Sequence, residues 1–141
     1  MLPRGIRNNN PGNIRHGTQT WAGEAVKQQD PSFVTFKTPE YGIRAIMKIL
    51  RTYHDKYVLI TIKQIITRYA PPQENDTASY IADVCKRCGL KQDDVINDII
   101  PVLVSLAQII ILHENGHPPP ETPPYWYGDN VYEKAKMMAL M

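Results

Sequence analysis

Residues 105–116 read SLAQIIILHENG, and this stretch decides how the chain folds. It completes a run from Ile99 to Leu112 that is apolar on nearly every side, which is typical of a helix in the middle of a small domain. The pair Asn115-Gly116 favours a left-handed stop, so Glu114 is expected where the helix ends. A carboxylate there contacts apolar side chains on one side and solvent on the other, and such surroundings can raise the pKa of a glutamate. Glu114 is therefore a candidate general acid, although most glutamates near helix ends are solvated surface groups.

The composition indicates a single domain. A chain of 141 residues can bury a sizeable core. Its 16 basic and 14 acidic residues give a net charge of +2, so no strong field attracts nucleic acid and no nucleic-acid partner is expected. No stretch approaches the roughly 18 uninterrupted apolar residues of a membrane span. The N-terminus lacks the apolar segment of a secretory signal, so we expect a protein made in the cytoplasm.

Helical patterns surround this central stretch. The periodicity of apolar residues and the capping signals predict helices over residues 40–57, 61–70, 77–89 and 98–114. Pro39 stands at the start of the first helix, and Thr61-x-x-Gln64 is a capping-box pattern. Asp76 or Thr77 can cap the third helix, and Pro101 is tolerated in the first turn of the fourth.

The ends of the chain have different character. Residues 4–15, RGIRNNNPGNIR, are rich in turn formers and predict an ordered loop. Short β-prone pieces around Trp21 and from Phe33 to Phe36 predict a small β hairpin lobe. Residues 118–124, PPPETPP, predict an extended spacer before a short helical tail from about Asn130, which either docks back or engages another chain. The fold class is therefore mainly α (α+β), with about five helices around a central apolar helix and a small hairpin.

Two cysteines and two histidines raise the question of a metal site. Cys85 and Cys88 form a CxxC pattern, and His113 and His117 form HxxxH. The gap between the pairs is longer than in compact zinc fingers and contains an apolar helix. We therefore expect partly buried thiols and no metal, with a small metal-dependent DNA-binding or regulatory domain as a rival interpretation.

Two segments together resemble a known superfamily. The run SLAQIIILHENG resembles the catalytic helix of lysozyme-like peptidoglycan glycosidases, especially bacterial glucosaminidases and lytic transglycosylases. The run NNNPGNIR at residues 8–15 resembles the Asn-rich segment that follows this helix in those enzymes, and residues 41–45 and 61–84 are similar to later passages. The order is reversed here, so the resemblance implies a circularly permuted lysozyme-like domain over residues 1–117, followed by a spacer and tail at residues 118–141. Such a permutation requires Gly116 to lie near the loop at residues 7–13.

The resemblance implies a substrate and a site. The substrate would be bacterial peptidoglycan, cleaved at β-1,4 glycan bonds without a cofactor, with Glu114 as the acid. Glu24 and Asp30 are candidates for a second carboxylate, although either is also explained as a solvated group, and transglycosylases can use one glutamate as acid and then base. The expected substrate-binding residues are Asn10, Asn13, Arg15, Trp21 and Tyr69. Turn formation explains the asparagines, and core packing explains Tyr69 and Trp21, nearly as well.

The setting implied by the resemblance is a bacteriophage. Virion-associated wall-degrading proteins of phages are similar in their opening residues, so the chain would be made in the host cytoplasm and act on the cell wall, with the tail meeting other virion proteins. Muramidase, glucosaminidase and lytic transglycosylase reactions all stay open. The alternative is a non-catalytic virion structural or wall-binding protein that keeps the lysozyme-like fold.

Overall fold

The computed structural model covers residues 1–141 and is built mainly of helices. The helices are α1 (Arg4–Arg7), α2 (Pro39–Asp55), α3 (Ile62–Tyr69), α4 (Thr77–Cys88), the 3-10 helix η1 (Ile100–Val102), α5 (Leu103–Asn115) and α6 (Asp129–Leu140). The expectation of a mainly α chain is confirmed. All five expected helices are present, and the four-residue α1 adds a sixth α-helix.

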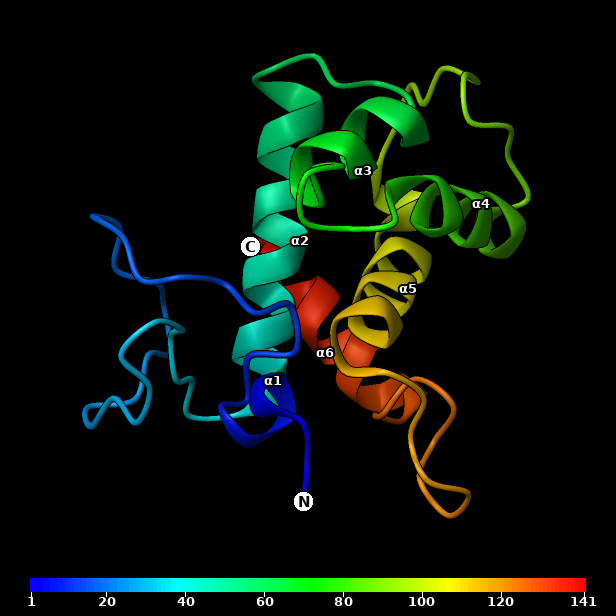
Figure 1. Ribbon diagram of the computed structural model, residues 1–141. Coiled ribbons are helices and arrows are strands. Elements are labelled where there is room, and N and C mark those ends of the chain that lie inside the picture. The colour runs from blue at the N-terminus through cyan, green and yellow to red at the C-terminus, as the bar shows by residue number, and fades with distance from the viewer.

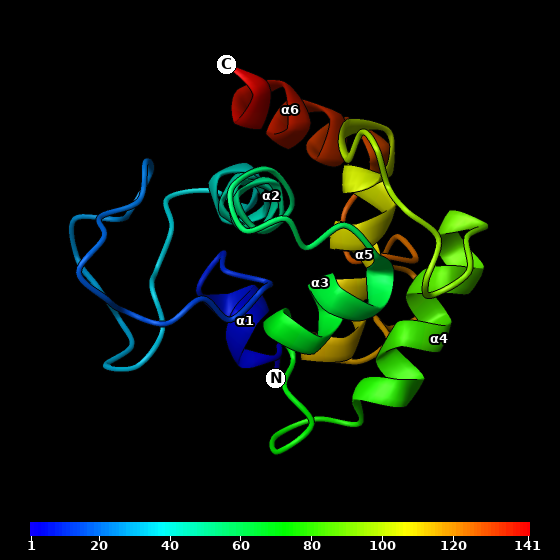
Figure 2. The same cartoon turned by 90° about the horizontal axis from the view of Figure 1, so that it is seen from above.

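The helices surround α5, which crosses the middle of the molecule (Figure 1). On one side α4 packs along α5, and α3 packs against α4. On the other side α2 packs against both α5 and α6. Seen from above, α2 separates α6 from α1 and the N-terminal loops (Figure 2). This arrangement leaves the end of α5 close to the beginning of the chain.

The central helix owes its position to its apolar surface. Leu103, Leu106, Ile110 and Ile111 are completely buried, because neighbouring helices cover α5 on several sides. It begins later than the sequence predicted, at Leu103 instead of near residue 98. Pro101 instead lies in a short 3-10 turn, in which the N–H of Val102 donates to the carbonyl of Ile99 at 3.0 Å.

Local capping determines the ends of α3 and α4. The Thr61 hydroxyl accepts a hydrogen bond of 3.2 Å from the N–H of Gln64 at the start of α3. Asp76 accepts one of 3.2 Å from Ser79 at the start of α4, and Gly89, with a φ of 67°, ends that helix. These boundaries agree with the sequence-based expectation to within a residue or two.

The expected β hairpin is not formed as regular strands. Between residues 15 and 36 the chain makes only two isolated antiparallel bridges, Arg15 with Phe33 and Glu24 with Phe36. The Gln28 side chain pairs with the backbone of Thr35: its Oε1 accepts from the Thr35 N–H at 2.7 Å, and its Nε2 donates to the Thr35 carbonyl at 2.9 Å. The same carbonyl accepts from the backbone N–H of Ala25 at 2.9 Å. The segment is therefore a folded loop that side chains hold together.

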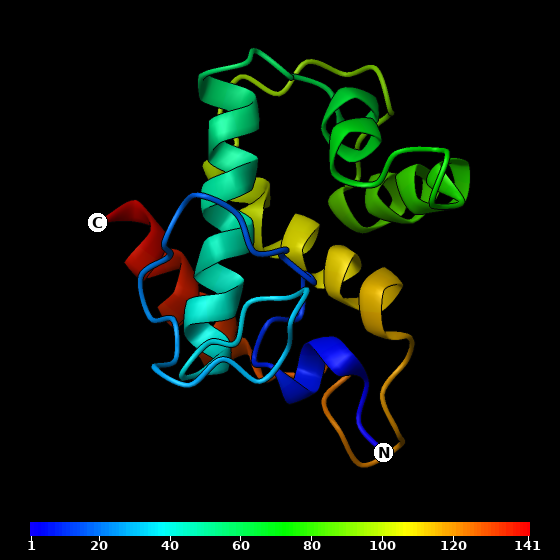
Figure 3. The ribbon, with the colours of Figure 1, turned by 60° about the vertical axis from the view of Figure 1, so that its left-hand side comes forward.

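The C-terminal helix docks back onto the core. Tyr132, Ala135 and Ala139 of α6 are completely buried, and α6 crosses α2 (Figure 3). Trp126, which is also buried, donates from Nε1 to the carbonyl of Gly116 at 2.8 Å and so ties the proline-rich segment to the end of α5. None of the helices combines the length and the apolar character that crossing a membrane requires.

Candidate functional site

The N-terminal loop meets the C-terminal end of α5. The Asn13 side chain donates from Nδ2 to Oε1 of Glu114 at 3.2 Å, and Asn115 donates from Nδ2 to the Pro11 carbonyl at 2.8 Å. The packing of α1 against α5 brings the two regions together (Figure 3). The proximity that a permuted domain requires between residues 7–13 and the end of this helix is thus present.

The composition of the loop follows from its backbone. Asn9 and Asn13 both have a φ of 51°, a left-handed conformation that asparagine adopts more readily than most residues. Gly12 lies so close to α2 and α3 that a Cβ there would stand 2.5 Å from the Tyr69 hydroxyl and 2.6 Å from Cγ1 of Ile46. The loop can reach Glu114 because these positions carry residues that permit tight turns and close contact.

A cleft of about 470 Å³ opens beside the Glu114 carboxylate. It is bordered by the N-terminal loop, by α2, by the end of α3 with the turn after it, and by the end of α5. Its lining residues are Gly12, Asn13, Ile14, Arg15, Phe33, Ile49, Tyr53, Tyr69, Glu74, Asn75 and Glu114. This mixture of apolar, aromatic, amide and charged groups is typical of a binding site for a polar ligand with extended faces.

The electrostatic environment of Glu114 favours the protonated acid. Burial raises the pKa of Glu114, while the hydrogen bond from Asn13 and the charge of His113 act in the opposite direction. The net shift is upward. Only one carboxylate oxygen has a hydrogen-bond partner in the protein, so the other is available to a ligand in the cleft. A half-buried glutamate with a raised pKa can hold and deliver a proton.

Tyr69, at the end of α3, lines the cleft and contacts the loop. Its hydroxyl donates to the Gly12 carbonyl at 2.9 Å. Burial and the nearby charge of Glu114 raise the pKa of Tyr69 well above its ordinary value, so the hydroxyl stays protonated. Tyr69 therefore holds the loop in place and presents its ring to the cleft, and it does not act as a base.

Three other residues expected to bind substrate occupy different positions. Arg15 lines the cleft with its guanidinium over the Phe33 ring, 4.9 Å from the centroid. Trp21 lies outside this cleft and lines an adjoining hollow. Asn10 is completely buried, and its Nδ2 donates to the carbonyls of Ile14 and Val34, both at 2.9 Å. The expected contact of Asn10 with substrate is therefore corrected to a role in holding the loop together.

The two carboxylates expected as partners of Glu114 do not line the cleft. Glu24 accepts from the backbone N–H of Trp21 at 2.5 Å. Asp30 is nearly buried, and its oxygens accept from Nε and Nη2 of Arg4 at 2.5 and 2.6 Å. The Arg4 guanidinium, together with hydrogen bonds from the loop backbone and from Asn8, holds the pKa of Asp30 well below its usual range. Both groups therefore stabilise the N-terminal loops.

Glu74 is the second carboxylate in the cleft lining, although a glutamate just before a helix is typical of a capping or structural group. The cap of α4 is Asp76, so the exposed Glu74 side chain is left without a hydrogen bond to the protein. The sequence signal for Glu74 is its position five residues after the expected cleft residue Tyr69. Residues 71–75 form the turn between α3 and α4.

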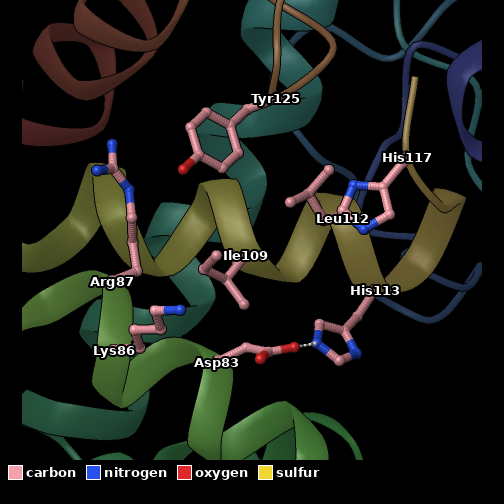
Figure 4. Close-up of a pocket in the computed structure, with 8 residues that line it drawn as sticks. All are labelled: Asp83, Lys86, Arg87, Ile109, Leu112, His113, His117 and Tyr125. Atoms are coloured by element: carbon pink, nitrogen blue, oxygen red, sulfur yellow. Dashed lines mark hydrogen bonds and ion pairs between the residues drawn. The ribbon is translucent and has the colours of Figure 1, made fainter. Parts of the chain in front are cut away.

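A second cavity, of about 620 Å³, lies between α4, α5 and the segment after α5 (Figure 4). His113 and His117 line it, and Nε2 of His113 pairs with Asp83 at 2.7 Å. Cys85 and Cys88 are half-buried thiols, as expected, and neither lines this cavity. No group of three or more metal-binding side chains gathers anywhere in the chain, so the two pairs do not form one site. Glu114 does not line this cavity, and it lines the cleft of about 470 Å³ described above.

No protein-family model matches the chain. The chain is 46% identical over 120 residues to Protein P5 of Pseudoalteromonas phage PM2, and this alignment covers 82% of the chain and 73% of the phage protein.

Proposed function

The chain belongs to the family of Protein P5 of Pseudoalteromonas phage PM2, and we propose that it is a phage-encoded glycosidase that cleaves bacterial peptidoglycan. In this proposal Glu114 acts first as general acid and then as base on a β-1,4 glycan bond. The observation that carries it is the half-buried Glu114 carboxyl, held by Asn13 at the side of a cleft.

We also propose that residues 1–117 form a circularly permuted lysozyme-like unit, with residues 118–141 as a spacer and covering helix. The hydrogen bonds from Asn13 to Glu114 and from Asn115 to Pro11 support this proposal. They connect the helix that resembles the catalytic helix to the segment that resembles its usual successor. Tertiary contacts thus bring together two elements whose order along the chain is reversed.

The cleft suits general acid catalysis. Cleavage of a glycosidic bond needs a proton on the leaving oxygen while positive charge develops on the sugar ring. A protonated Glu114 donates that proton and becomes a carboxylate. The carboxylate then takes a proton from the group that attacks the sugar: a water molecule in a hydrolase, or a hydroxyl of the same sugar in a lytic transglycosylase. The hydrogen bond from Asn13 stabilises the carboxylate between the two steps.

One glutamate is sufficient for this scheme. Glu24 and Asp30 are engaged in the N-terminal loops and do not line the cleft. Glu74 does line it, but its side chain is exposed to solvent, unlike the half-buried side chain of Glu114. A half-buried acid, an aromatic wall and amide donors favour the single-glutamate reaction over one that uses two opposed carboxylates.

The test is the release of soluble fragments from purified peptidoglycan. Glu114→Gln should fold normally and lower the rate by about 10²–10⁴-fold, the usual contribution of a general acid. Glu133→Gln, which changes an exposed glutamate on α6, should leave the rate unchanged. Mass analysis of the products then distinguishes a 1,6-anhydro end, a reducing muramic end and a reducing glucosamine end.

The same experiment tests the alternative of a non-catalytic structural or wall-binding protein. The absence of Glu24 and Asp30 from the cleft is the observation that favours it. This alternative requires that the unaltered protein bind peptidoglycan without releasing any fragment. Full lytic activity in Glu114→Gln would instead rule out Glu114 as the acid.

A further inference from the structure

A second hollow, of about 480 Å³, continues the cleft along α2. Ile49 and Tyr53 line both spaces, so they form the boundary through which the cleft passes into the hollow. The hollow is lined by Gln19, Thr20, Trp21, Ala22, Arg44, Lys48, Ile49, Thr52 and Tyr53. A long ligand that passes Glu114 would therefore also pass this part of α2.

The hollow carries positive charge without a counterion. Arg44 and Lys48 are four residues apart on α2, and neither takes part in any of the four ion pairs of the chain. Neither side chain donates a hydrogen bond to the rest of the protein. Like charges at this spacing repel each other and destabilise a helix. Burial, together with the charges of Arg44 and Arg51, lowers the pKa of Lys48, as expected of a crowded cation.

The neighbouring groups complete a binding surface. Trp21 is half-buried and lines the hollow together with the two cations, so it adds aromatic surface to the site. Its backbone N–H donates to Glu24 at 2.5 Å. Thr52 contributes an exposed hydroxyl on the same side of α2. Two unpaired cations, a hydroxyl and an aromatic wall fit an organic carboxylate better than an uncharged sugar.

We propose that this hollow binds the carboxylates of the peptide stems of peptidoglycan while the glycan strand lies in the cleft at Glu114. The inference rests on the proposed function, because it takes peptidoglycan as the ligand. Peptide stems branch from the glycan strand at regular intervals and carry free carboxylates. These carboxylates can pair with Arg44 and Lys48, which have no acidic partner in the protein. The hollow then selects glycan that still bears its peptides over bare glycan.

The experiment compares peptidoglycan before and after an amidase has removed the peptide stems. The unaltered protein should cleave the stem-bearing material faster. Arg44→Gln/Lys48→Gln should lower kcat/KM on stem-bearing material by about tenfold, the effect of losing charge-assisted contacts. Its activity on bare glycan should stay the same, because the cleft at Glu114 is untouched. Equal losses on both substrates, or none on either, would overturn the proposal.

A matched control removes two other positive charges. Lys91→Gln/Lys134→Gln changes exposed lysines that line neither the cleft nor the hollow, and it should leave both activities unchanged. Thermal unfolding gives a separate check on the folding of Arg44→Gln/Lys48→Gln. Its Tm should be equal to or above that of the unaltered protein, because the substitution removes repulsion along α2.

If the unaltered protein cleaves neither substrate, calorimetry with soluble stem-bearing glycan fragments measures binding directly. Arg44→Gln/Lys48→Gln should bind these fragments about tenfold more weakly than the unaltered protein does. Added salt should weaken binding by the unaltered protein, because it screens the attraction between the cations and the carboxylates. Glu133→Gln, which changes an exposed glutamate outside both spaces, should bind as the unaltered protein does. Equal affinity of Arg44→Gln/Lys48→Gln and the unaltered protein would overturn the carboxylate site, whatever the outcome for catalysis.

Discussion

Asn13 and Glu114, which are 101 positions apart in the sequence, are joined by a 3.2 Å hydrogen bond between the side-chain amide and the carboxylate. This contact links the N-terminal loop to the end of the most buried helix. It also opposes the effect of burial on the pKa of Glu114. The relationship makes the acidity of Glu114 depend on a residue at the other end of the chain.

The first prediction concerns this acidity. Asn13→Gly removes the amide and tolerates the φ of 51°, so the pKa of Glu114 should rise further and the alkaline limb of the pH–rate profile should move to higher pH. Carbon-13 NMR of the Glu114 carboxyl measures the same shift directly. Asn9→Gly is the control, because Asn9 has the same φ and its amide bonds to the Phe36 carbonyl instead. A similar shift in both variants would contradict the assignment.

The second prediction concerns stability and the charge of Glu114. Because its pKa is raised in the folded state, the folded protein binds a proton more tightly than the unfolded chain does, and this contribution to stability is lost as pH rises. Glu114→Gln should therefore have a higher Tm than the unaltered protein at pH 7. The difference should shrink as pH falls toward about 4, where glutamates are protonated in both states. Thermal melts across this range would show it, and a Tm gain that stays constant with pH would contradict it.

The third prediction concerns the close approach of the loop to α2 and α3. Gly12→Ala places a Cβ 2.5 Å from the Tyr69 hydroxyl and 2.6 Å from Ile46 Cγ1, so one of them must move. Overpacking of this kind costs about 1–3 kcal/mol in the free energy of unfolding. Gly17→Ala is the matched control, because a Cβ at Gly17 meets no atom within 4 Å. Denaturant melts of the two variants measure the difference, and similar midpoints would show that the loop is not tightly packed.

The fourth prediction concerns Asp30, whose ion pair with Arg4 holds the N-terminal loops. Its pKa is depressed in the folded state, so its stabilisation is present above the ordinary aspartate pKa and is lost as pH falls. Asp30→Asn should therefore be less stable than the unaltered protein at pH 7. Unfolding at neutral and acidic pH should show the gap narrowing below about pH 4. If the gap instead widened in acid, the ion pair would not be its cause.

Local sequence determined the helices because their signals lie within a few residues of each boundary. Thr61, Asp76 and Gly89 end or begin helices through contacts with neighbouring residues, and the apolar surface of α5 alone indicated a central helix. The β lobe was less predictable. The sequence predicted a β hairpin there. The structure instead has a folded loop with two isolated bridges, in which the Gln28 amide pairs with the backbone of Thr35.

The sequence by itself also placed Glu114 at the end of an apolar helix, because an Asn-Gly stop is a local signal. Only the tertiary structure decided which groups surround it. In the folded chain Asn13 donates a hydrogen bond to Glu114, and Asp30 forms an ion pair with Arg4. Glu74 lines the cleft. Such choices depend on the packing of whole helices, since a side chain's partners are set by position in space and not by distance along the chain.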